Sequence, residues 1–235
     1  MKNVLLVLAT LFFTGTVVAD NHANAESTAI STVVSFSTTD PASAVAAMTE
    51  FAASDCRKNA PATMRLTADN WNGTETNSHS LLMSFADANA MLQTYGAFQQ
   101  CEAWQKLMAS AAANSKPHSQ YLMRSLLAEG DSSKDAMYTI WQMRVTDEAA
   151  YLKAFGKLMK AQIASGAVTG AYGVWRVVGG ADAEITHVSY VGAPNPADML
   201  GGSLRPNDDV MEFYQTVSDS RSITRQIVNS VVADF

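Results

Sequence analysis

The feature that most constrains the fold of this sequence is a weak internal repeat, in which two stretches about 107 residues apart follow the same order of patterns. Each stretch begins with an apolar strand pattern, at residues 32–37 in the first and 138–143 in the second. Each strand pattern ends before an aspartate, Asp40 or Asp147, which is suited to cap the amphipathic helix that follows. The chain is therefore expected to fold into two similar halves.

The remainder of each stretch also follows one order, with two strands around a turn, a second helix and a closing strand. In the first half the second and third strands, the turn between them, the helix and the closing strand are expected at residues 63–67, 79–85, 70–73, 87–108 and 121–127. In the second half the same five elements are expected at residues 173–178, 187–191, 179–182, 196–217 (a helix broken at Arg205 and Pro206) and 226–232.

Each half therefore has the order β-α-β-β-α-β, which forms a four-stranded antiparallel sheet with two helices on one face. The other face of each sheet would expose a large apolar patch unless something covered it. We expect an α+β fold in which two ferredoxin-like repeats, residues 28–131 and 132–235, pack sheet to sheet as a pseudo-dimeric α/β barrel.

This tandem order resembles the dimeric α/β-barrel superfamily in a fused, two-copy form. The passage from Phe85 through Ala90, followed by Tyr95 to Trp104, is similar to that superfamily's connection between its third strand and its second helix. The resemblance implies a functionally mixed group, which includes cofactor-free monooxygenases, haem-handling proteins, small lyases and members of no known activity. No catalytic motif of a particular member maps onto these residues, so the resemblance implies a fold and not a function.

The first 25 residues are typical of a secretory signal peptide. Lys2 precedes an apolar run over residues 4–18, and small residues allow cleavage after Ala19 or after Ala25. An uncleaved anchor is the alternative, but the run is shorter than the roughly 20 residues that a spanning helix needs. We expect a periplasmic or secreted protein without a membrane span after cleavage.

Composition narrows the choice of partners. The net charge is −6 and no cluster of lysine and arginine occurs along the sequence, so a nucleic-acid partner is not expected. The chain has two cysteines, Cys56 and Cys101, and in an oxidising compartment an even number of cysteines favours a disulfide between them. Two separate buried thiols are the alternative.

Histidines at equivalent places in the two halves are candidates for chemistry. His79 and His187 each begin a third strand, and either one is suited to act as a general base or as a haem ligand. The alternative is a strand-start histidine whose ring nitrogens bond to the backbone or to water. No metal site is expected, because no further ligands stand at the spacing that zinc requires.

Aromatic and arginine side chains are weak candidates for binding a ligand. A small-molecule pocket is mostly apolar with a few polar groups, and the aromatic candidates are Trp71, Trp104, Trp141, Trp175, Tyr138 and Tyr190. Arg65 and Arg176 lie on the second strand of each half and are suited to hold a carboxylate or a phosphate. The alternatives are core packing for the aromatic residues and surface ion pairs for the arginines.

The sequence leaves several functions open. The first is an exported, soluble protein that binds a small apolar or aromatic ligand, or a protein partner. The second is a cofactor-independent, monooxygenase-like enzyme, and the third is a haem-associated protein; both rest on the resemblance. Whether the chain is an enzyme is not decided, and apart from the haem that the resemblance implies no cofactor is expected.

Overall fold

The computed structural model describes residues 28–202 and 205–235 of the chain. The predicted signal peptide lies outside these residues, and so does Leu204 in the predicted helix of the second half. Among the described helices, none has the length and apolar character that crossing a membrane requires.

Eight strands, four from each half, form the centre of the molecule. Those of the first half are β1 (Ile30–Thr38), β2 (Ala62–Trp71), β3 (His79–Phe85) and β4 (Ser115–Glu129). Those of the second half are β5 (Met137–Val145), β6 (Tyr172–Gly179), β7 (His187–Ala193) and β8 (Arg221–Asp234).

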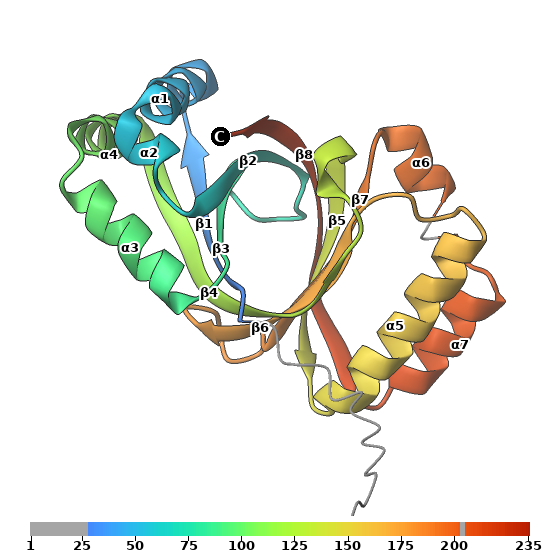
Figure 1. Cartoon of the computed structure of the whole chain (residues 1–235). Helices are drawn as coiled ribbons and strands as arrows, with labels where there is room; N and C mark the ends of the chain where they lie inside the picture. Colours follow the sequence, from blue (N-terminus) through green and yellow to red (C-terminus); the bar gives the residue numbers. More distant parts are fainter. Residues whose placement is uncertain (1–27, 203–204) are drawn as a thin grey trace, which may run out of the picture.

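The strands close into one antiparallel barrel in the order β1-β3-β2-β8-β5-β7-β6-β4 (Figure 1). Each half contributes the same internal order, β4-β1-β3-β2 and β8-β5-β7-β6, which is that of a ferredoxin-like sheet. The halves also join edge to edge, because β2 pairs with β8 and β4 pairs with β6. Closure satisfies the strand edges that two open sheets would leave unpaired. The predicted pseudo-dimeric α/β barrel is confirmed, while the boundary between the repeats stays a prediction.

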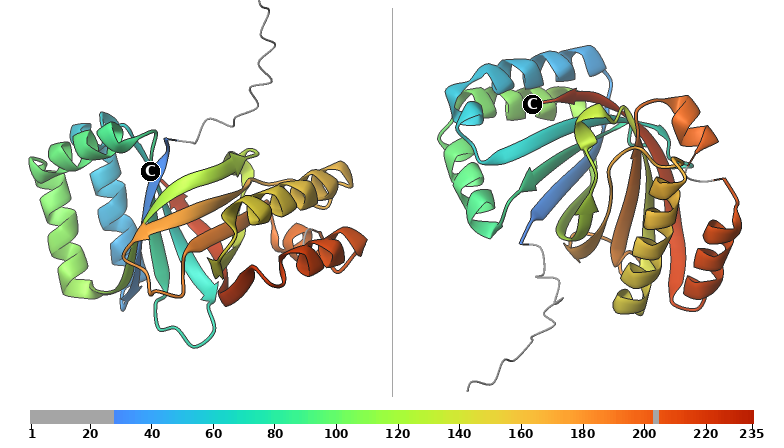
Figure 2. Two further views of the ribbon diagram at one scale, coloured as in Figure 1. Left: turned by 90° about the horizontal axis from the view of Figure 1, so that it is seen from below. Right: turned by 45° about the vertical axis from the view of Figure 1, so that its right-hand side comes forward.

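Helices cover two opposite sides of the barrel (Figures 1 and 2). The helices of the first half are α1 (Pro41–Ala53), α2 (Asp55–Lys58), α3 (Ala88–Gln99) and α4 (Glu102–Asn114). Those of the second half are α5 (Glu148–Ala164), α6 (Pro196–Gly201) and α7 (Asp208–Val217), and a short 3₁₀ helix, η1 (Ser132–Lys134), connects the halves. Two apolar cores fill the space between helices and strands, one around Phe51 and Phe98 and one around Tyr151 and Phe155.

The predicted helix starts have a clear local cause. Asp40 Oδ1 accepts a hydrogen bond from the backbone N–H of Ser43 at 3.0 Å, and Asp147 Oδ1 accepts one from Ala150 at 3.0 Å. Each carboxylate therefore satisfies an N–H group in the first turn that has no partner within the helix. The same capping at the same place in both halves follows from the repeat.

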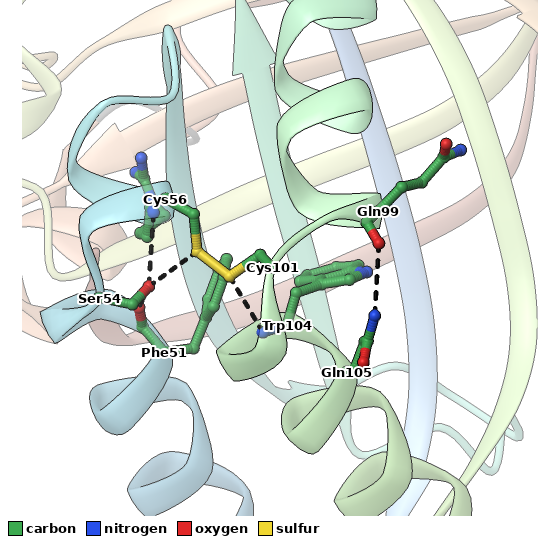
Figure 3. Close-up of a disulfide and its surroundings, with 8 residues drawn as sticks. Phe51, Ser54, Cys56, Gln99, Cys101, Trp104 and Gln105 are labelled. Carbon is green, nitrogen blue, oxygen red and sulfur yellow. Dashed lines mark hydrogen bonds between the residues drawn. A yellow bond between two sulfur atoms is a disulfide. The ribbon is translucent and has the colours of Figure 1, made fainter.

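The single helix predicted over residues 87–108 is wrong, because the chain breaks into α3 and α4 at Cys101. This residue has extended backbone dihedrals, φ −100° and ψ 114°, and its Sγ caps α4 by accepting the N–H of Trp104 at 3.3 Å. Cys101 also forms the predicted disulfide with Cys56, with the two Cα atoms 6.1 Å apart (Figure 3). The break thus places Cys101 where it reaches the segment after α1.

The second strand of the first half is longer than predicted. It was expected to end at Thr67, before a turn over residues 70–73, but β2 continues to Trp71. The paired residues Asp69 and Asn229 belong to the hydrogen-bonded seam between β2 and β8. This seam explains the added length, since the partner strand comes from the other half of the chain and has no signal in the local sequence.

Candidate ligand-binding cavity

The barrel encloses a cavity of about 590 Å³, to which all eight strands contribute lining residues. Successive side chains of a strand point to opposite faces, so one set of alternate residues points inward and the other set packs against the helices. On β2 the inward set is Thr63, Arg65, Thr67 and Asp69, and on β5 it is Tyr138, Ile140 and Gln142. The volume is within the range of small-molecule sites, roughly 300–1,000 Å³.

The middle of the cavity is apolar. Its aliphatic lining comes from both halves and consists of Val33, Leu82, Met123, Ile140, Val188 and Ile227. These side chains offer dispersion contacts and no hydrogen bonds, so this zone is suited to hold a hydrocarbon or aromatic body.

Three aromatic rings form one wall of the cavity. Trp175 stacks on Tyr190 with centroids 4.5 Å apart, and Tyr138 meets Tyr190 edge-on at 6.0 Å. Burial raises the pKa of Tyr190 to about 12, and burial also raises the pKa of Tyr138. Both phenols therefore keep their protons near neutral pH and present an uncharged surface.

One end of the cavity, which we call the mouth, is lined by Arg65, Asp234 and the exposed residues Asp131, Ser132 and Ser133. Arg65 donates from Nε to Asp234 Oδ1 at 2.6 Å, from Nη2 to Asp234 Oδ2 at 2.9 Å, and from Nη1 to the Tyr138 hydroxyl. Arg65 Nη2 also donates to the backbone carbonyl of Ser132 at 3.1 Å. The guanidinium therefore joins β2, β5, β8 and η1 at the mouth.

The opposite end, which we call the inner end, is lined by polar side chains from both halves: the buried Thr67, Asp69, Gln142 and Asn229 and the half-buried Ser80. Asp69 Oδ2 accepts from Asn77 Nδ2 at 2.6 Å and from Ser80 Oγ at 2.8 Å. Asn229 Nδ2 donates to Thr67 Oγ1 at 3.2 Å, across the seam between β2 and β8. Burial raises the pKa of Asp69, and the hydrogen bonds from Ser80 and Asn77 oppose that effect.

Four of the side chains proposed from sequence as ligand-binding residues meet in this cavity, namely Arg65, Tyr138, Trp175 and Tyr190. The others lie elsewhere. Trp71 is 62% exposed, whereas Trp104 packs in the helix-side core of the first half and Trp141 against that of the second. Arg176 pairs with Glu148 at the start of α5.

Neither histidine lines the cavity. His79 precedes the inward-facing Ser80, and His187 precedes the inward-facing Val188, so both rings are on the helix side of the barrel wall. His187 Nε2 lies 2.9 Å from Glu148 Oε2 and its Nδ1 lies 2.8 Å from Thr186 Oγ1. His79 stacks on Phe36, and burial lowers its pKa.

A haem bound through His187 does not fit these contacts. Both ring nitrogens of His187 are engaged by neighbouring side chains, and His79 Nδ1 lies 2.8 Å from Ser78 Oγ.

The polar side chains of the inner end were not among the residues proposed from sequence. Asp69 lay between the predicted strand and the predicted turn, and Gln142 and Asn229 stood within apolar strand patterns. A signal was present in the alternation of Arg65, Thr67 and Asp69, which places three polar side chains on one face of a strand.

Comparison with protein-family models and with curated protein sequences finds no match. Solved structures do match over most of the chain. A proposed monooxygenase from Lactobacillus acidophilus NCFM superposes with a TM-score of 0.64 and 9% identity, over 87% of this chain and 93% of its own.

Two further structures superpose with TM-scores of 0.55. An anthrone oxidase-like protein is 9% identical over 88% of this chain and 93% of its own, and a variant chlorite dismutase from Candidatus Nitrospira defluvii is 10% identical over 88% and 92%. At such low identity these likenesses establish the shared dimeric α/β-barrel fold and carry no activity over to this chain.

Proposed function

We propose that this chain is an exported binding protein that holds a small apolar or aromatic molecule inside its barrel. The observation that carries the proposal is the 590 Å³ cavity, with its aliphatic middle, its wall of Trp175, Tyr190 and Tyr138, and its polar groups confined to the two ends. Protein interiors are normally close-packed, with few voids larger than a water molecule. A volume of this size at the centre of the barrel therefore supports a role in binding.

Export is part of the proposal and rests on two features. The first is the signal-like segment over residues 1–25. The second is the disulfide between Cys56 and Cys101, since disulfides persist in oxidising compartments outside the cytosol. Mass spectrometry of the intact protein from a secretion-competent host tests both features, with an expected start after Ala19 or Ala25 and a mass two hydrogens below that of the dithiol.

A monooxygenase-like enzyme is the second candidate, favoured by the name of the structural neighbour from Lactobacillus acidophilus NCFM. The base proposed for such an enzyme from the sequence is His79 or His187, and both histidines face away from the cavity. Binding is therefore the function that the geometry supports better.

The proposal is tested by fluorescence titration with N-phenyl-1-naphthylamine, an apolar dye whose fluorescence increases in an apolar environment. The dye is expected to bind the wild-type chain at one saturable site. Ile140→Trp adds a large ring to the centre of the cavity and should abolish this binding. Ile223→Trp, at a position on β8 that is 42% exposed, is the matched control and should bind the dye as the wild type does.

Thermal unfolding of both variants shows whether each one is folded. If Ile140→Trp is folded and binds the dye as tightly as Ile223→Trp does, the dye is outside the barrel and the proposal fails. The proposal also fails if the wild-type protein does not bind the dye after unfolding and refolding have removed any co-purified ligand.

A further inference from the structure

The cavity is chemically different at its two ends, and the geometry of one strand gives the distance between them. Arg65 at the mouth and Asp69 at the inner end are four residues apart on β2 and point to the same side. A strand rises about 3.3 Å per residue, so their Cα atoms are separated by about 13 Å. A ligand that spans the apolar middle therefore brings one of its ends close to Asp69.

The charged groups around the cavity are predominantly acidic. Its charged lining residues are three carboxylates, Asp69, Asp131 and Asp234, against the single guanidinium of Arg65. Arg65 forms a two-point ion pair with Asp234, so its charge is largely matched at the mouth. The hydrogen-bond partners of Asp69 are the neutral side chains of Asn77, Ser80 and Asn229. Within the cavity lining, Asp69 therefore has no cationic partner of the kind that Arg65 gives Asp234 at the mouth, and the nearby His79 on the helix side favours its charge only when the imidazole is protonated.

Two amide oxygens at the inner end have no donor. Gln142 Oε1 and Asn229 Oδ1 are buried without a hydrogen-bond partner among the described residues, and their side chains are 9% and 4% exposed. A buried acceptor without a donor destabilises the folded state, and a ligand that supplies the donor removes that penalty. Both residues line the cavity with Asp69, but the two oxygens expose almost no surface to it, so they accept from a ligand only once their amide groups turn toward the cavity.

From this placement we infer that the cavity selects an aromatic molecule that bears a cationic amine, with the ammonium group held by Asp69, Gln142 and Asn229 at the inner end. The inference rests on the proposed binding function and specifies its ligand class. An ammonium group has three N–H donors and a positive charge, so it matches both the acceptors and the unbalanced carboxylate. A carboxylate-bearing ligand would meet the same groups with repulsion, and the aromatic body would pack against Trp175 and Tyr190.

Isothermal titration calorimetry with four ligands that share one ring tests the inference on the wild-type protein. The ligands are indole-3-ethylamine, indole-3-ethanol, 3-ethylindole and indole-3-propionate. The amine is expected to bind about tenfold more tightly than 3-ethylindole or better, because a charge-assisted hydrogen bond contributes about 1.5–3 kcal/mol. The alcohol should fall between the two, and the carboxylate should bind most weakly.

The variant Asp69→Asn assigns the effect to the inner end. It should remove most of the preference for the amine over 3-ethylindole. Asp219→Asn makes the same change at an exposed position after α7 and should leave all four affinities as they are. If Asp69→Asn fails to fold, the order of affinities on the wild-type chain still decides the question.

The outcomes separate this inference from the proposed function. If N-phenyl-1-naphthylamine binds inside the barrel but the amine and 3-ethylindole bind equally, the ligand class is wrong and the binding function stands. An amine preference that persists in folded Asp69→Asn would overturn the role of the inner end. If neither the dye nor any indole binds, the binding function itself fails.

Discussion

Trp175 on β6 and Tyr190 on β7 lie face to face on the cavity wall, with ring centroids 4.5 Å apart and ring planes inclined by 28°. Offset stacking of this kind fixes both rings, so a bound ligand meets a rigid surface. The stack also brings an indole fluorophore into the cavity, whereas Trp71 is 62% exposed at the end of β2. Trp175 can therefore report on the cavity from within the unlabelled protein.

The first prediction is that a cavity ligand changes tryptophan emission through Trp175. Titration with ethylbenzene, which does not absorb tryptophan emission, should shift or quench the fluorescence of the wild-type protein. Trp175→Phe should remove most of that response, and Trp71→Phe should keep it. A response that survives in Trp175→Phe would place the ligand away from the stack.

The second prediction concerns the disulfide. Cys56 and Cys101 are 45 residues apart in the sequence, and a cross-link that closes a loop of this length stabilises a fold by about 2–4 kcal/mol. The double variant Cys56→Ala/Cys101→Ala should lose that amount in urea unfolding. Ligand binding by the folded variant should be unchanged, because the bond lies between helices outside the barrel (Figure 3). The wild-type protein with reductant is the matched comparison and should show a similar loss.

The order of elements was predictable because its signals are local. The side chains of Asp40 and Asp147 cap the helices that follow them, and the repeat places both residues at the same point in each half. The split between α3 and α4 was not predictable in this way. Its cause is the backbone at Cys101, which is tied to Cys56 on a distant segment, and the apolar spacing continues through the break.

The residues that line the cavity could be predicted only in part, because the strands of a barrel covered by helices are buried on both faces. Trp175 points inward while its neighbour Arg176 points to the helices, and the sequence shows no polar face that would distinguish the two sides. Where one face of a sheet is exposed to solvent, apolar and polar residues alternate along each strand, and this alternation shows which face is buried. Tyr138 likewise points into the cavity and Trp141 points to the helix side, and the pairing register of β5 was needed to distinguish the two.

The third prediction concerns stability in acid. Hydrogen bonding from Arg176 is the largest cause that lowers the pKa of Glu148, burial opposes it, and His187 adds a further hydrogen bond to the carboxylate. A carboxyl group whose pKa is lower in the folded state stabilises that state above its unfolded pKa of 4.5, and the contribution disappears as pH falls through the folded value.

Urea unfolding as a function of pH measures this effect. The stability difference between the wild-type protein and Glu148→Gln should be constant above about pH 5.5 and should shrink as the pH falls below the unfolded pKa. Arg176→Met removes the main partner and should show a similar loss near neutral pH. A difference that does not change with pH would mean that Glu148 ionisation is not linked to folding.

The last prediction tests the seam that joins the halves. Gly180 follows β6 with φ +87°, and a Cβ at this position would overlap the backbone carbonyl of Gln120 on β4, the strand that pairs with β6 across the seam. Gly180→Ala should therefore destabilise the fold by about 2 kcal/mol or more, because a positive φ is unfavourable for alanine and its Cβ would overlap the carbonyl. Gly156 on α5 has open space around its Cβ position, so Gly156→Ala should instead stabilise by about 0.5–1 kcal/mol. Urea midpoints that move in opposite directions for these two substitutions are the expected result. If Gly180→Ala is as stable as the wild type, the turn does not lie against β4 and the closed barrel is in doubt at this seam.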